Sequence, residues 1–128
     1  MDELVEAARA AHDNSYAPYS EYPVGAAVET ADGTVFTGCN IEVINFSNSM
    51  HAEEVAISEA VKEGHTDFAR VAVSSAARDG VTPCGMCRQT LAEFAGEDLT
   101  VLCDEGDGVA EYTLDELLPA TMTEEMLE

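Results

Sequence analysis

Basic residues are scarce in this 128-residue chain. Five lysines and arginines stand against 26 aspartates and glutamates, which gives a formal net charge of -21 at pH 7. Non-specific binding to nucleic acids and to anionic membranes depends mainly on lysine and arginine, so this balance argues against both partners. An acidic surface can simply serve solubility. The near absence of lysine, with Lys62 alone, instead favours a protein adapted to high salt, where self-repulsion is screened.

Long apolar runs are also missing. No apolar stretch approaches the length of a membrane span, and we expect no secretory signal before the first helical pattern. The four cysteines therefore indicate a cytoplasmic protein with reduced thiols, in which metal binding is commoner than disulfides. Cys39 and Cys103 lie in strand-like stretches, and we expect both to be buried as small hydrophobic residues.

The order of helical and strand-like patterns predicts one domain over residues 1–128. An opening helix precedes a hairpin, and helices then alternate with strands, which is typical of a layered α/β fold with a mixed sheet. The expected helices cover 4–11, 51–63 and 84–94, the hairpin strands cover 24–30 and 35–40, the later strands cover 69–75 and 100–103, and residues 112–118 give a last strand edge with a short helix.

The most informative pattern is His51-Ala52-Glu53, followed further along by Pro83-Cys84-Gly85-Met86-Cys87. A structural zinc site usually has four protein ligands, whereas a catalytic one has three and leaves a position for water. His51, Cys84 and Cys87 supply three ligands of the types that zinc prefers. H-x-E followed by P-C-x-x-C is the signature of zinc-dependent deaminases of cytosine and adenine, so the pattern predicts one catalytic Zn²⁺.

Each part of this pattern also has a plainer explanation. A lone C-x-x-C is often structural or redox-active, and a glutamate in a first helical turn is favoured by the helix dipole. The parts together favour catalysis, because both halves lie at predicted helix starts, where unpaired N–H groups stabilise thiolates. Deamination of cytosine requires attack at C4 and protons for N3 and the departing amino group, and Glu53 is the carboxylate in the motif that can carry them.

Beyond the zinc motif, the chain resembles the short, single-domain cytidine deaminases that act on free nucleosides. The resemblance runs from about Leu4 to Leu127 and implies a three-layer α/β/α sandwich with a mixed, roughly five-stranded sheet. The segments that carry it are A-P-Y-S at 17–20, V-G-A-A at 24–27, G-C-N-I-E at 38–42, H-A-E at 51–53, P-C-G-M-C-R-Q at 83–89 and E-L-L-P at 116–119.

The resemblance also implies roles for residues outside the metal site. Asn40 and Glu42 are expected to hold the ribose hydroxyls, for which an amide and a carboxylate offer both donors and acceptors. Tyr22 occupies the place of an aromatic residue that lines the nucleoside pocket, and the backbone N–H of Ala52 is expected to bond the pyrimidine carbonyl. Members of this family suggest a homo-oligomer, most simply a tetramer, in which Met122 reaches a neighbour's pocket.

Three positions depart from the short family members. His51 stands where they commonly have a cysteine, and Glu54 stands where those members often carry an arginine. The two changes agree, because two thiolates already balance Zn²⁺ and a compensating arginine is not needed. Met122 replaces a common aromatic residue, although a thioether can still cover a ring. Arg88 is expected to lie near the thiolates and to donate to one of them from outside the ligand set.

The sequence thus favours zinc-dependent hydrolysis of cytidine and deoxycytidine to uridine and deoxyuridine with release of ammonia, as in pyrimidine salvage. The alternative is a related deaminase of a cytosine-containing nucleoside antibiotic, which Met122 leaves open. A non-catalytic zinc module would gain nothing obvious from Glu53. Editing of DNA or RNA is opposed by the acidic charge and by the lack of a basic, aromatic strand-binding surface.

Overall fold

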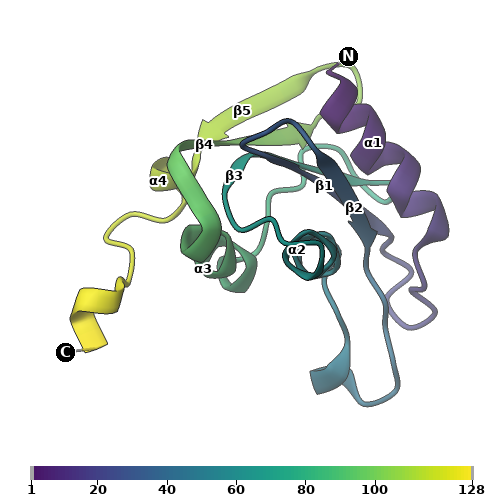
Figure 1. The fold of residues 1–128 in the computed structure, drawn as a ribbon. Coiled ribbons are helices and arrows are strands. Elements are labelled where there is room, and N and C mark those ends of the chain that lie inside the picture. The colour runs from purple at the N-terminus through teal and green to yellow at the C-terminus, as the bar shows by residue number, and fades with distance from the viewer. Residues whose placement is uncertain (1, 128) are drawn as a thin grey trace.

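A mixed five-stranded sheet forms the centre of the protein (Figure 1), in a computed structural model that describes residues 2–127, without the side chains of residues 96 and 97. Residues 1 and 128 of the expected domain lie outside the described residues. The strand order is β2-β1-β3-β4-β5, and the β3–β4 pair is parallel while the other three pairs are antiparallel. The strands are β1 (Val24–Thr30), β2 (Val35–Cys39), β3 (Phe68–Ser75), β4 (Ala95–Asp104) and β5 (Val109–Thr113).

Helices cover both faces of this sheet (Figure 1). α1 (Glu3–Ala11) packs on one face, while α2 (Ala52–Lys62) and α3 (Gly85–Phe94) pack on the other. Successive strand residues point to opposite faces, so Ala27 lies in the cluster beneath α1, whereas Ala26 and Val28 lie in the cluster beneath α2 and α3. The predicted three-layer α/β/α sandwich is therefore confirmed.

Two strand glycines allow the helices to approach the sheet closely. A Cβ at Gly25 would lie 2.0 Å from the backbone oxygen of Ala8 in α1. A Cβ at Gly38 would lie 2.5 Å from the backbone nitrogen of Ala56 in α2. Both distances are far below van der Waals contact, so any side chain at either position would push a helix away. Gly38 thereby sets the height of α2 above the sheet.

The boundaries of the last two strands differ from the sequence prediction. β4 begins at Ala95 instead of residue 100, and β5 begins at Val109 instead of residue 112, before the short helix α4 (Leu114–Leu117). Cys103 is buried as expected, but Cys39 is only partly buried. The prediction for Cys39 was wrong because β2 is an edge strand, where one side lacks a neighbouring strand.

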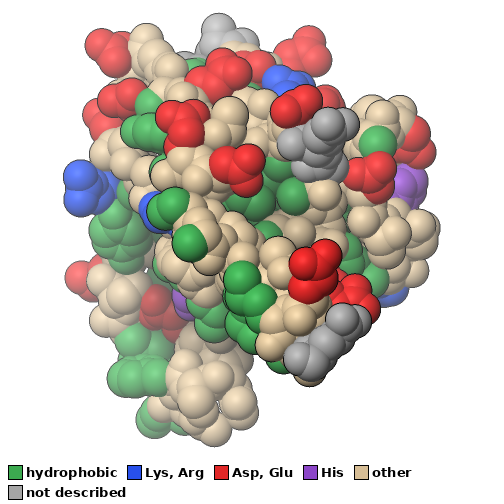
Figure 2. Space-filling model, turned by 90° about the vertical axis from the view of Figure 1, so that its left-hand side faces the viewer, with side chains coloured by type: hydrophobic (Ala, Val, Ile, Leu, Met, Phe, Trp, Pro, Cys, Tyr) green, Lys and Arg blue, Asp and Glu red, His purple; other side chains and the backbone are tan. Residues whose placement is uncertain are grey.

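A loop at 41–50 projects from the end of β2 towards the start of α2 (Figure 1). It contains a short 3-10 turn, η2 (Phe46–Asn48), and leaves Ile44 82% and Phe46 69% exposed. The net charge of -21 makes the chain strongly acidic, and Figure 2 shows many Asp and Glu side chains on one face with few Lys or Arg among them. Within the described residues, no helix is long and apolar enough to cross a membrane.

Candidate metal centre and active site

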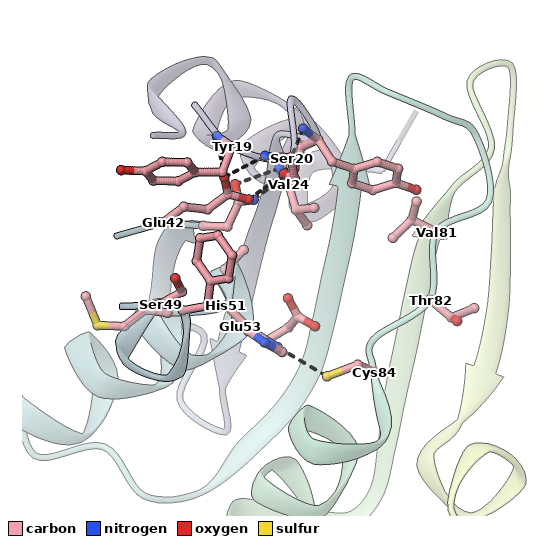
Figure 3. Close-up of a pocket in the computed structure, with 15 residues that line it drawn as sticks. Tyr19, Ser20, Val24, Glu42, Ser49, His51, Glu53, Val81, Thr82 and Cys84 are labelled. Atoms are coloured by element: carbon pink, nitrogen blue, oxygen red, sulfur yellow. Dashed lines mark hydrogen bonds between the residues drawn. The ribbon is translucent and has the colours of Figure 1, made fainter. Parts of the chain in front are cut away.

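Two helix starts bring the predicted metal ligands together. His51 is the residue before α2, Cys84 is the residue before α3, and Cys87 lies in the first turn of α3. The Nδ1 atom of His51 is 3.2 Å from Sγ of Cys84 and 3.3 Å from Sγ of Cys87. All three ligand atoms lie within 4.8 Å of one another (Figure 3 labels His51 and Cys84). Residues from separate helices thus converge on one point.

The chemistry of this group fits zinc. In a tetrahedral site with ordinary Zn–N and Zn–S bonds, a ligating nitrogen and sulfur lie about 3.6 Å apart. The observed separations are a few tenths of an ångström shorter, so a small outward movement of the side chains would admit the ion. Two thiolates and a neutral imidazole also balance the charge of Zn²⁺. Three protein ligands leave a fourth position, which is the mark of a catalytic site.

The protonation of Cys87 is coupled to metal binding. Burial first, and then the negative charge of Glu53 beside it, raise the pKa of the Cys87 thiol well above its ordinary value. A bound Zn²⁺ outweighs both effects, because a thiol that coordinates zinc is deprotonated outright. Metal binding must therefore release a proton from this site, and zinc affinity should rise with pH.

Glu53 is one of the few charged residues in the interior. It lies in the first turn of α2 and is only 5% exposed. Burial raises the pKa of its carboxyl group. Glu54, the next residue, points elsewhere: its Oε1 accepts a hydrogen bond of 3.0 Å from the backbone N–H of His51. The two neighbouring glutamates are thus separated, one buried beside the ligands and one fixing the backbone of the histidine.

A cavity of about 570 Å³ opens above Glu53 (Figure 3). This volume lies within the range of small-molecule sites. Four of the five residues predicted to contact the nucleoside line the cavity, namely Tyr22, Asn40, Glu42 and Ala52. His51, Glu53 and Cys84 also line this cavity, so two of the candidate metal ligands and the predicted sugar-binding residues face the same cavity.

Hydrogen bonds hold both predicted ribose-binding side chains in place. Oδ1 of Asn40 accepts from the backbone N–H of Val24 at 2.9 Å, and its Nδ2 donates to the carbonyl of Tyr22 at 2.8 Å. Oε1 of Glu42 accepts from the backbone N–H groups of Tyr19 and Ser20, both at 3.0 Å. Ser20 also donates its hydroxyl to Glu42, and these bonds lower the pKa of the Glu42 carboxyl group. Glu42 is therefore an oriented anion at neutral pH.

Other lining residues were not predicted from the sequence. Ser20 belongs to the A-P-Y-S segment, in which the sequence gives it no separate role, yet it orients Glu42. Val81 and Thr82 form the wall beside Cys84, and Phe46 lines the cavity from the projecting loop. The only available signal for Val81 and Thr82 was their position just before the C-x-x-C motif.

Two further predicted residues, Met122 and Arg88, do not line the cavity of this chain. Met122 was expected to reach a neighbour's pocket; within one chain it is 52% exposed, and its carbonyl accepts a bond of 3.2 Å from Gln89. Arg88 gives its hydrogen bonds to Pro83, Thr82 and Leu117. The expected donation from Arg88 to a thiolate is therefore not what the described structure shows, because backbone carbonyls and a hydroxyl take up the guanidinium instead.

Comparison with known proteins gives a consistent result. The profile of the cytidine and deoxycytidylate deaminase zinc-binding region matches residues 1–103. A cytidine deaminase from Sporosarcina psychrophila is 38% identical over 128 residues, which is 99% of this chain and 94% of that protein. The crystal structure of a cytidine deaminase from Burkholderia pseudomallei superposes with a TM-score of 0.87 at 38% identity, covering 95% of this chain and 100% of that one. A blasticidin-S deaminase from Bacillus cereus is 33% identical over 112 residues, covering 81% of this chain and 79% of that protein.

Proposed function

Because this chain belongs to the cytidine deaminase family, we propose that it hydrolyses both cytidine and deoxycytidine, as one catalytic domain over residues 1–128 that serves pyrimidine salvage in the cytoplasm. The observation that carries the proposal is the shared cavity. His51, Glu53 and Cys84 line the same cavity as Asn40 and Glu42, and His51 and Cys84 form with Cys87 the group that could hold a metal ion.

Glu53 moves the protons of the reaction. Zn²⁺, which His51, Cys84 and Cys87 would hold, would supply an activated water near neutral pH. Glu53 accepts one proton of the attacking water and passes it to N3 as the water oxygen bonds to C4 of the cytosine ring. Glu53 then carries the second proton of the water to the amino group, so that C4=O forms, the C4–N bond breaks and ammonia leaves. Burial of Glu53 suits this role, since a raised pKa lets one carboxyl group both accept and donate.

The remaining lining residues orient the nucleoside. Glu42 accepts from one sugar hydroxyl, and the amide of Asn40 has one N–H left to donate after its bond to Tyr22. Tyr22 contributes an aromatic wall. Ala52 is the first residue of α2, where backbone N–H groups lack helical partners, and its N–H donates to the pyrimidine carbonyl.

We further propose that the working form is a homo-oligomer, most simply a tetramer. Ile44 and Phe46 are exposed on the loop beside the cavity, and Met122 is exposed on the C-terminal segment. A neighbouring subunit that covers this rim would exclude water and strengthen the electrostatics of the site. The net charge of -21 makes association depend on salt, because subunits repel over a longer distance at low ionic strength. Sedimentation across a salt series tests this: oligomer and activity should fall together, whereas a fully active monomer at low salt would contradict it.

Deamination of a cytosine-containing antibiotic is the second candidate, favoured by the similarity to the Bacillus cereus blasticidin-S deaminase. The deciding assay incubates zinc-loaded protein at high salt with cytidine, deoxycytidine, cytosine or blasticidin S, and measures ammonia. We expect turnover of the two nucleosides and little from the free base. Turnover of blasticidin S alone would replace the first candidate with the second.

Glu42→Gln tests the assignment of the sugar-binding end. The change keeps the size of the side chain but removes the charge that the loop N–H groups orient. Lost polar contacts to a substrate cost a few kcal/mol, so the preference for cytidine over cytosine should shrink. Equal losses on nucleoside and base would assign Glu42 to loop structure instead. Asn40→Ala is a less clean test, because Asn40 also bonds Val24 and Tyr22.

A further inference from the structure

The segment between Gly80 and Cys84 carries a metal ligand but has few bonds of its own. The N–H of Gly80 is anchored to the carbonyl of Asp104 at 2.8 Å, and the carbonyl of Cys84 accepts the first bond of α3 at 2.9 Å. Between these two points, within the part of the chain that the structure describes, residues 81–83 make hydrogen bonds only with Arg88. Val81 and Thr82 also line the cavity, so the same segment shapes the pocket.

Arg88 bonds this segment with two of its donors and uses a third elsewhere. Its Nε donates to the carbonyl of Pro83 at 2.7 Å, and its Nη2 donates to Oγ1 of Thr82 at 3.2 Å. Its Nη1 donates to the carbonyl of Leu117 at 2.9 Å, at the end of α4. A guanidinium presents its donors in a rigid plane, so these three acceptors are held in a fixed relation to one another.

The position of Arg88 is electrostatically unfavourable for a helix. It lies in the first turn of α3, at the positive end of the helix dipole, where an acidic residue is preferred. The hydrogen bonds to Pro83, Thr82 and Leu117 offset this cost.

We infer that Arg88 is a positioning residue, which holds the 81–84 segment against α3 and the end of α4 so that Sγ of Cys84 stays within reach of His51 and Cys87. This inference rests on the proposed function, because it takes these three residues as the zinc ligands. Cys84 is the exposed ligand and Cys87 the buried one. Release of the segment would therefore open the site at Cys84 first.

The test follows zinc release from the intact, metal-loaded chain into excess of a chromogenic chelator. Loss of a residue that orients metal ligands typically costs about 10- to 100-fold in metal affinity, so Arg88→Ala should release zinc faster by that factor. Arg88→Lys should be intermediate, because one ammonium cannot reach three separated acceptors. Thr82→Val, which removes a single acceptor, should have a smaller effect in the same direction.

Arg78→Ala is the matched control. It removes the same charge from the loop that follows β3, but Arg78 is exposed there, and among the described residues it bonds only its neighbour Asp79, at 3.4 Å. We expect its zinc release within twofold of wild type. KM for cytidine, measured on metal-saturated protein, should rise for Arg88→Ala and Thr82→Val but not for Arg78→Ala, since Val81 and Thr82 line the cavity.

Two results would overturn this inference without touching the proposed function. The first is that Arg88→Ala releases zinc at the same rate as Arg78→Ala. The second is that Arg88→Lys releases zinc at the wild-type rate, which would mean that a positive charge at this position is enough and the three hydrogen bonds are not needed. If Arg88→Ala does not fold, Arg88→Lys and Thr82→Val decide the matter by the same criterion. A wild-type chain that binds no zinc would overturn the proposed function together with this inference. The zinc-release measurement needs no substrate, so it still tests the role of Arg88 if the protein does not deaminate cytidine.

Discussion

Gly38→Ala should damage the site although Gly38 itself does not line the cavity. Gly38 lies in β2, paired with Ala26 and directly beneath α2. A Cβ there would lie 2.5 Å from the backbone nitrogen of Ala56 and 2.6 Å from the backbone oxygen of Ala52. Ordinary contact begins near 3.4 Å, so α2 must retreat by about 0.9 Å, the difference between 3.4 Å and 2.5 Å. Both obstructing atoms are helix backbone and cannot rotate aside. Overpacking of this kind costs about 1–3 kcal/mol of stability.

The retreat of α2 carries catalytic consequences. α2 holds Glu53 and starts after His51, whereas Cys84 and Cys87 belong to α3 and stay behind. A misplacement of about 1 Å can cost on the order of 10²-fold in rate. We therefore expect kcat/KM on cytidine to fall by about that factor, even with zinc supplied in excess.

The assay for Gly38→Ala combines urea denaturation with kcat/KM on metal-saturated protein. Gly108→Ala is the control, because a Cβ at Gly108 meets nothing within 4 Å. If the stability of Gly38→Ala stays within about 0.5 kcal/mol of wild type and its kcat/KM is unchanged, the close approach at Gly38 does not set the position of α2.

Two further predictions concern stability and the metal. The Arg9 guanidinium, 2.9 Å and 2.7 Å from the carboxylate oxygens, lowers the pKa of Asp104 to about 2, together with hydrogen bonds from Ser74 and Gly106. The ionised Asp104 carboxylate should stabilise the fold above about pH 4, and at most about 2 kcal/mol of this stability should be lost as pH falls from there towards 2, a loss that denaturation of Asp104→Asn should not show. Alanine at His51, Cys84 or Cys87 should each leave less than one zinc per chain by metal analysis. A variant that keeps stoichiometric zinc would remove its residue from the ligand set.

The sequence predicts the centre of this fold better than its edge. Apolar periodicity and glycine placement predict β1, α2 and α3. Each helix buries one apolar face and β1 is covered on both faces, so each element leaves a clear apolar pattern in the sequence. β5 is an edge strand of mixed polarity, so Val109 and Ala110 give no clear pattern before Tyr112. Pairing with β4 makes them a strand, and pairing is a long-range property that local composition does not reveal.

The same division holds within the site. His51, Glu53 and the two motif cysteines could be located from spacing because their chemistry depends on side-chain type at helix starts. The partners of Arg88 could not be predicted from spacing, since two of its three acceptors are backbone carbonyls and Leu117 lies far along the chain. The role proposed for Met122 requires a second subunit, so its environment within one chain does not test it.

Glu53→Gln offers the most direct test of the central claim, that one buried carboxylate beside a zinc site carries out deamination. The measurement pairs metal analysis with ammonia release from cytidine, on wild type and variant prepared together. We predict one zinc per chain in both proteins, with turnover in the variant reduced on the order of 10⁴-fold. A variant that keeps zinc and deaminates cytidine at nearly the wild-type rate would contradict the assignment of Glu53 and the mechanism built on it.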